Sequence, residues 1–191
     1  MKKSTLIAVF ALGMTSLFAE EAKTPAMADG FEHVFKNDAG TLMNDDWRIN
    51  NSRFLPKDGT YTLVTDAKNG KYALQLTASN EGKGFGVYGG GLPVIVTPGA
   101  KVEIIFYAKG KGTFNVGFNG YDTQNTWVKD SAAVSEIKLD SEKEWKEQKV
   151  SLEVPALPSI GYIFLVFELS PNSSVVFDEV SVNVGKKEEG K

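Results

Sequence analysis

Apolar and polar residues alternate in short runs along most of the chain. In one run, Val102, Ile104 and Phe106 fall on one side, while Glu103 and Tyr107 fall on the other. A period of two is typical of a β-strand with one face in the core and the other in solvent. Gly, Pro, Asn and Asp separate the runs. The pattern predicts strands at residues 31–35, 47–50, 61–65, 72–78, 85–88, 101–109, 113–121, 134–139, 144–152, 162–169 and 175–184.

Beyond the N-terminus, no segment keeps the 3.6-residue period of an amphipathic helix, and no repeat or long linker divides the chain. We therefore expect one all-β domain, a sandwich or barrel, over residues 30–184. Residues 20–29 are expected to form a flexible leader and residues 185–191 a charged, frayed tail.

The N-terminus has the layout of a secretory signal peptide. Lys2 and Lys3 precede an apolar run of 13 residues, Leu6–Phe18, and Ala19 provides a small residue for cleavage. This run is shorter than the about 20 residues that a transmembrane helix needs. Residues 1–19 are therefore predicted to be removed and the protein to be secreted or periplasmic. A retained anchor or a buried N-terminal helix is the alternative.

Composition narrows the possible chemistry. The 191-residue chain has no cysteine, which excludes disulfides, thiolate metal sites and cysteine nucleophiles. His33 is the only histidine, so a site with several imidazoles is excluded as well. The formal charge of −3 becomes −5 when Lys2 and Lys3 leave with the signal peptide. These mildly acidic, scattered charges argue against nucleic acid as a partner.

The polar faces of the predicted strands combine aromatic rings with amides and carboxylates. Sugars stack their C–H faces on Trp and Tyr rings, and planar polar groups bind their hydroxyls. An ordinary solvated sheet face is the alternative interpretation. Trp127 is the strongest candidate because it lies in the polar loop 121–127, although packing within that loop would also explain it. The full set is Trp47, Tyr88, Tyr107, Tyr121 and Trp127 for stacking, with Gln75, Asn115, Asn119 and Glu168 for hydrogen bonding.

Five segments, taken in order, resemble the jelly-roll carbohydrate-binding modules of families 4, 9, 16 and 22, which are galactose-binding-like domains. The resemblance covers nearly all of residues 30–184 and implies a jelly-roll β-sandwich. It also implies that Trp145 is a core residue at the start of a strand. Because similar segments occur in sandwiches with other ligands, it implies the fold more strongly than the sugar. The segments are GFE at 30–32, NGKYAL at 69–74, residues 98–109, residues 145–154 and FDEV at 177–180.

The same resemblance implies a structural calcium ion where the first and last strands meet. The matching positions are the carboxylates of Glu32 and Asp178, with main-chain carbonyls near Gly30 and Lys71. Calcium prefers six to eight oxygen ligands of this kind. The alternative is that Glu32 and Asp178 are ordinary carboxylates at strand ends.

These observations favour an exported, non-catalytic protein that binds a polysaccharide or glycan chain. The negative charge favours a neutral glycan, and a separate secreted enzyme is a candidate partner because modules of this kind are usually tethered to one. Two alternatives remain open. One is a structural or protein-binding β-sandwich, and the other is a small jelly-roll glycoside hydrolase or lyase. A hydrolase would need two carboxylates across a cleft, for which Glu103 and Glu168 are the natural pair.

Overall fold

The computed structural model describes residues 25–36 and 42–185. Over these residues the chain forms strands and one 3-10 turn, η1 (Pro56–Asp58), and contains no α-helix. The strands are β1 (Met27–Asp29), β2 (Val34–Lys36), β3 (Leu42–Asn44), β4 (Arg48–Ile49), β5 (Gly59–Val64), β6 (Ala73–Ala78), β7 (Phe85–Tyr88), β8 (Val94–Ile95), β9 (Lys101–Tyr121), β10 (Ala133–Glu153), β11 (Tyr162–Leu169) and β12 (Ser174–Val184). The predicted all-β class is confirmed.

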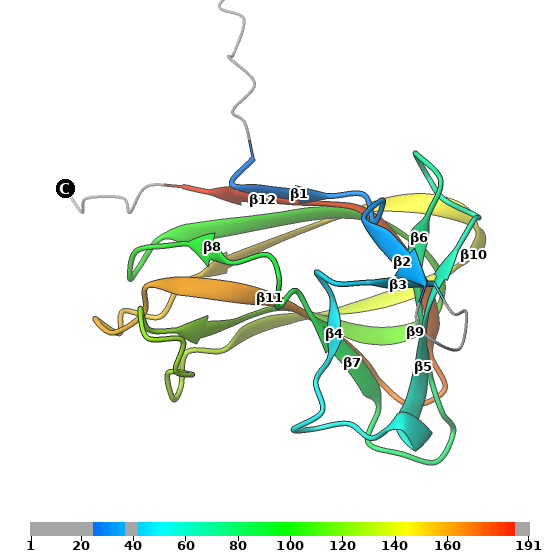
Figure 1. The fold of residues 1–191 in the computed structure, drawn as a ribbon, viewed down its shortest axis with the longest axis horizontal. Coiled ribbons are helices and arrows are strands. Elements are labelled where there is room, and N and C mark those ends of the chain that lie inside the picture. Colours follow the sequence, from blue (N-terminus) through cyan, green and yellow to red (C-terminus); the bar gives the residue numbers. More distant parts are fainter. Residues whose placement is uncertain (1–24, 37–41, 186–191) are drawn as a thin grey trace, which may run out of the picture.

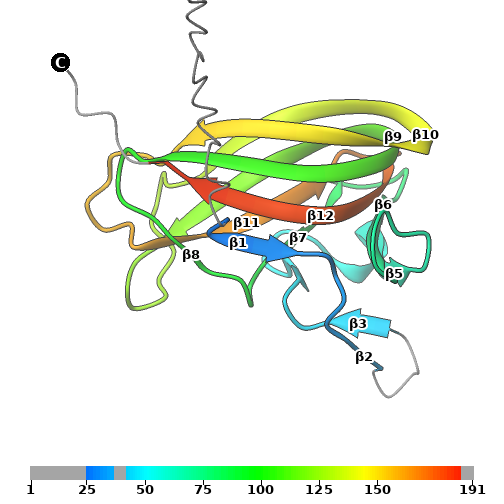
Figure 2. The ribbon, with the colours of Figure 1, turned by 90° about the horizontal axis from the view of Figure 1, so that it is seen from above.

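Nearly all strands belong to one antiparallel sheet that folds over on itself (Figure 1). Its strand order is β4-β7-β11-β9-β12-β6-β5, with β10 on β9, β1 on β12 and β8 on β11. Strands β2 and β3 form a separate hairpin. Figure 2 shows β9, β10 and β12 running together along one side of the molecule.

Strand β9 connects the two layers of the sandwich. Residues 102–111 pair with β12, whereas residues 114–121 pair with β11. Gly110 and Gly112 lie between these halves with φ of 136° and 132°, a region that favours glycine. We call the sheet around β12 the β12 layer and the sheet around β11 the β11 layer. The predicted strands 101–109 and 113–121 are thus one bent strand, and the same holds for 134–139 and 144–152, which merge into β10.

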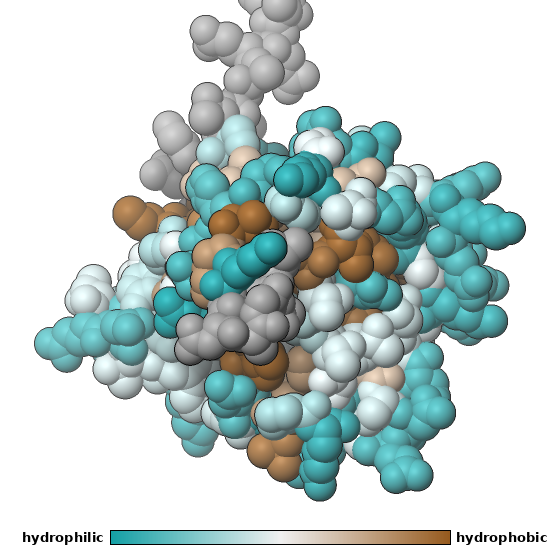
Figure 3. Space-filling view, turned by 45° about the vertical axis from the view of Figure 1, so that its right-hand side comes forward, coloured by the Kyte–Doolittle hydropathy of each residue, from teal (hydrophilic) through white to brown (hydrophobic). Residues whose placement is uncertain are grey.

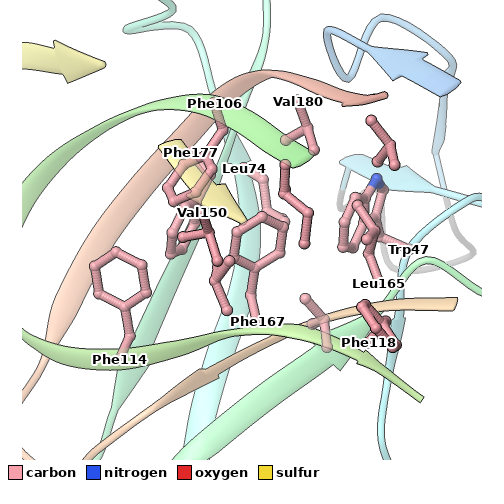
Figure 4. Packing of buried hydrophobic residues seen from close by; sticks show 14 of the residues in the cluster. Trp47, Leu74, Phe106, Phe114, Phe118, Val150, Leu165, Phe167, Phe177 and Val180 are labelled. Atoms are coloured by element: carbon pink, nitrogen blue, oxygen red, sulfur yellow. The ribbon is translucent and has the colours of Figure 1, made fainter. Parts of the chain in front are cut away.

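The core lies between the two layers and is rich in phenylalanine (Figure 4). Phe106 and Phe177 come from the β12 layer and pack on Phe167 of β11, with ring centroids 5.3 Å and 4.6 Å away. Apolar residues of this size, removed from water on both sides, supply the main driving force for the sandwich. The inward positions are those that the period-two pattern marked as apolar.

Two expectations about the N-terminal part of the domain need correction. Strand β1 lies inside residues 20–29, which were expected to be a flexible leader, and pairs with β12 through Met27, Ala28 and Asp29. The strand expected at 31–35 is reduced to β2, because Phe31 has φ of 59° and is buried in the core. The predicted signal peptide and most of the charged tail lie outside the described residues.

Candidate functional site

The outward side of the β11 layer, here called the β11 face, collects six of the nine predicted binding residues. Directly opposite residues in antiparallel strands project from the same side of a sheet. Glu168 of β11 lies opposite Asn115 and Gly86, and Tyr162 lies opposite Tyr121. The same register places Asn119, Tyr88 and Phe164 on this face, and an isolated bridge joins Tyr121 to Trp127.

Four aromatic rings form a continuous cluster on the β11 face. Tyr121 and Tyr162 stack with centroids 5.9 Å apart and an interplanar angle of 11°. Phe164 lies beneath them, 5.0 Å from Tyr121 and 5.3 Å from Tyr162, and Tyr88 extends the cluster on the other side of Phe164, 6.1 Å away. We call Tyr88, Tyr121, Tyr162 and Phe164 the aromatic cluster. Phe164 is buried and the tyrosines are half-buried, so the tyrosines contribute the accessible part of the platform.

Trp127 stands next to this cluster on an ordered loop. The residue is 52 % exposed. The preceding turn is held by Asp122, whose Oδ1 accepts hydrogen bonds from the main-chain N–H groups of Gln124 and Thr126. The Tyr162 hydroxyl donates to Asn125 Oδ1 at 2.6 Å, which ties the loop to the cluster. A large exposed ring on a fixed loop is available for stacking without first being ordered.

A buried carboxylate and an exposed guanidinium pair beside the cluster. Arg53 Nη1 lies 2.5 Å from Glu168 Oε1, and the side chains are 58 % and 11 % exposed, respectively. Burial raises the pKa of the Glu168 carboxyl above its ordinary value, and the nearby Arg53 charge partly opposes this rise. The pair supplies a hydrogen-bond acceptor and several donors at one point of the face.

A cavity of about 460 Å³ lies between Trp127 and Arg53. Tyr121, Asn119 and Asn50 contribute to its walls, so rings and amides line the same space. A flat ring next to planar hydrogen-bonding groups is the arrangement that suits a sugar residue.

The outward side of the β12 layer offers no comparable platform at its two large rings. Tyr107 donates its hydroxyl to Glu147 Oε2 at 2.9 Å, and the Lys68 ammonium lies 5.0 Å from its ring. The Lys109 ammonium lies 4.6 Å from the Trp145 ring and also pairs with Asp66. Lysines therefore cover both rings. Trp145 is half-buried on this outward side and is not a core residue, which corrects the expectation.

Three predicted ligand-binding residues lie away from the β11 face. Trp47 is 1 % exposed, packs against Phe31 and Phe167, and donates its indole N–H to Asp29 Oδ2 at 2.6 Å. It is a core residue, and the expectation of a stacking role was wrong. Tyr107 belongs to the β12 layer, as does Gln75, which lies on β6 between Thr62 and Val176.

The carboxylates proposed as a hydrolase pair are on different layers. Glu103 lies in the first half of β9, opposite Asn183 of β12, and its Oε1 accepts from Lys149 Nζ at 2.6 Å. Glu168 belongs to the β11 face. Two carboxylates on opposite outer faces of a sandwich cannot flank one glycosidic bond, so this pair is excluded.

The residues expected to hold calcium converge on the loop before β6. Glu32 Oε1 accepts hydrogen bonds from the N–H groups of Lys71 (2.7 Å) and Tyr72 (2.9 Å). Asp178 is fully buried, and its Oδ2 accepts from the N–H groups of Lys68 and Asn69. Burial raises the Asp178 pKa, which these N–H groups oppose. The two carboxylates are of the kind that calcium prefers, but the partners seen here are N–H donors. Within residues 25–36 and 42–185, no group of three or more His, Asp or Glu is arranged around a common point.

Sequence reasoning missed Arg53, Tyr162 and Phe164. Both aromatic residues share the parity of Glu168 in the strand Tyr162–Leu169, so following the period-two pattern back from Glu168 by three steps would have found them. Arg53 lies in a turn 115 residues before Glu168, and no local pattern indicates that the two meet.

Figure 3 shows one side of the molecule, where small apolar patches lie among hydrophilic side chains. In the described part of the chain, no helix is long and apolar enough to cross a membrane.

Comparison with known proteins identifies the fold. No protein-family model and no curated protein matches the sequence. Among solved structures, a family 22 xylan-binding domain from a Paenibacillus barcinonensis xylanase superposes with a TM-score of 0.54 at 15 % identity, covering 85 % of this chain and 96 % of that one.

Two longer chains contain a similar domain. A Clostridium thermocellum xylanase chain with a family 22 module gives a TM-score of 0.56 at 18 % identity over 87 % of this chain, and the match spans 29 % of that chain. The enzymatically active part of tailspike protein 4 of bacteriophage CBA120 gives 0.57 at 17 % identity over 73 % of this chain and 19 % of that one. At these identities the likeness concerns the fold, and the fold of this chain is that of the jelly-roll carbohydrate-binding modules.

Proposed function

We propose that the protein binds a polysaccharide or glycan chain on the β11 face without cleaving it. The observation that carries this proposal is the aromatic cluster, whose rings lie under no lysine of residues 25–36 and 42–185 and adjoin a cavity lined by Trp127, Asn119 and Arg53. Rings that stack on sugar C–H groups and polar groups that bind hydroxyls meet there and not on the β12 layer. The similar xylan-binding domain adds support from the fold.

The test is binding of purified protein to a panel of polysaccharides, with release of reducing ends and unsaturated sugars measured in the same samples. Tyr121→Ala is expected to weaken binding at least about fivefold, since a stacked ring contributes on the order of 1 kcal/mol or more. Tyr107→Ala is the matched control, because it removes the same side chain from the other layer.

Binding that depends on Tyr121 but not on Tyr107, with no sugar released, supports the proposal. Sugar release would overturn the non-catalytic part and direct attention to the β11 face as a catalytic surface. No binding across the panel would overturn the proposal and favour the β11 face as a protein-binding surface, since exposed aromatic residues also anchor protein interfaces.

We also propose that the carboxylates of Glu32 and Asp178, with main-chain carbonyls near Gly30 and Lys71, hold a structural calcium ion. The convergence of both side chains on the loop at residues 68–72 supports this. A calcium ion there would share the carboxylates of Glu32 and Asp178 with the N–H groups from which they now accept hydrogen bonds. The proposal requires that calcium raise the melting temperature and that a chelator reverse the effect.

We also propose that a cleaved N-terminal signal exports the protein. Outside the cytoplasm, it would act beside a separate secreted enzyme. Mass spectrometry of the mature protein tests the first, since cleavage after Ala19 gives a chain starting at Glu20. Co-fractionation with secreted glycoside hydrolases tests the second.

A further inference from the structure

A second cavity, also of about 460 Å³, continues from the first on the far side of Arg53. The two cavities share Ser52 and Arg53 as a common wall. A chain ligand that lies on Trp127 and Tyr121 can therefore extend past Arg53 into this second space.

The second cavity is lined by three basic side chains, Arg53, Lys57 and Lys83. Lys57 and Lys83 are exposed, and within residues 25–36 and 42–185 neither forms an ion pair. Glu168 engages one nitrogen of the Arg53 guanidinium, which carries five N–H donors in total. Cationic donors thus remain available to a ligand.

Two acidic residues share this lining, Asp58 and Glu81. Asp58 is buried, and its Oδ2 accepts a hydrogen bond from the Leu55 N–H at 2.7 Å, so it serves the turn around η1. Glu81 is exposed, and its negative charge offsets the positive charge of one lysine without forming an ion pair with it in the described part of the chain. Glu168 already pairs with Arg53 and Asp58 is held by the turn, so the charges left exposed to a ligand in this cavity are the ammonium groups of Lys57 and Lys83 against the single carboxylate of Glu81.

The two segments that carry the lysines are held together by the main chain. Lys57 lies in η1, and Lys83 lies in the loop that follows β6. The Ser79 N–H at the base of that loop donates to the Asp58 carbonyl at 2.8 Å. The fold therefore constrains the distance between the two main-chain segments from which the lysine side chains extend.

We propose that this cationic cavity, defined by Arg53, Lys57 and Lys83, binds an acid group on the glycan, a carboxylate or a sulfate, so that the preferred ligand is an acidic polysaccharide. This inference rests on the proposed function and replaces the neutral ligand that the net charge favoured. Net charge is a poor guide here, because salt screens charges beyond a Debye length of about 8 Å at physiological ionic strength. The local groups decide which sugars bind.

The experiment compares a uronic-acid-containing xylan with the same xylan after its carboxyl groups have been reduced to alcohols. The acidic form is expected to bind at least about threefold tighter at low salt, the range of one or two solvent-exposed ion pairs, and to lose this advantage at high salt. A sulfated polysaccharide, measured in parallel, distinguishes sulfate from carboxylate as the preferred group.

The double variant Lys57→Gln/Lys83→Gln should abolish the preference while leaving binding of the reduced xylan unchanged. Lys149→Gln is the matched control, since Lys149 belongs to the β12 layer and pairs with Glu103. Circular dichroism of each variant confirms folding.

Equal affinity for both xylans, or a preference that survives the double variant, overturns this inference and leaves the proposed function intact. Loss of binding to every glycan, in a folded wild-type protein, overturns both.

Discussion

Arg53 Nη1 and Glu168 Oε1 are 2.5 Å apart, although the residues are separated by 115 positions in the chain. The contact joins the turn after β4 to β11, and it places a charged pair at the wall that the two cavities share. The positive charge of Arg53 also stabilises the ionised form of Glu168, whose side chain is largely closed to water.

The titration of Glu168 predicts a specific pH dependence. Its pKa is raised above the ordinary value of 4.5 by burial, so the folded protein retains this proton at pH values where the unfolded chain has lost it. Its contribution to stability therefore falls as the pH rises through the window above about 4.5. Relative to Glu168→Gln, which has no such titration, the wild-type free energy of unfolding should decrease as the pH rises above about 4.5.

Urea unfolding of both proteins at several pH values measures this difference. A difference that stays constant across the range contradicts the prediction. Arg53→Gln provides a second check, because loss of the neighbouring positive charge should raise the Glu168 pKa further and widen the window.

Two tryptophans should respond oppositely to truncation. Trp127→Ala should weaken glycan binding strongly while changing stability by no more than about 0.5 kcal/mol, because the ring is largely in solvent. Trp47→Ala should cost about 3–5 kcal/mol, because its ring is enclosed by Phe31 and Phe167. Thermal unfolding and binding isotherms separate the two effects. A strongly destabilised Trp127 variant would make that ring a packing element instead.

Removal of the Asp178 carboxylate should loosen the loop before β6. Asp178→Ala leaves the N–H groups of Lys68 and Asn69 without their acceptor, at an expected cost of about 1–3 kcal/mol. Asp140→Ala, at an exposed position of β10, is the control. Repeating the wild-type melt with calcium and with EDTA separates this anchor from ion binding. If neither addition moves the melting temperature of metal-free protein, the calcium proposal fails while the anchor remains.

The bend in β9 should depend on Gly110. An added Cβ there would collide with the Ser174 carbonyl, and the φ of 136° is unfavourable for alanine. Gly110→Ala should therefore lower stability by about 1–3 kcal/mol. Gly89→Ala is the control, since its Cβ would meet only ordinary contacts at 3.7 Å or more. Equal melting temperatures for the two variants would show that the bend does not need glycine.

The sequence by itself determined the β class, most strand positions and which side of each strand enters the core. Those properties follow from local backbone geometry, because successive side chains of a strand point to opposite faces. For Trp127 the polar loop left exposure and loop packing both open, and the structure shows the residue 52 % exposed. Six of the nine predicted binding residues lie on the β11 face. Their outward orientation could be predicted because the alternation of side chains along a strand is a local property.

Only the tertiary structure decided which strand faces share a layer. Glu103 and Glu168 have the same outward parity, yet the bend at Gly110 and Gly112 puts them on opposite sides of the sandwich. Trp47 and Trp127 are chemically alike, and only the enclosure of Trp47 by Phe31 and Phe167 separates core from surface. Strand pairing and ring packing join residues that are distant along the chain, so no local pattern specifies them.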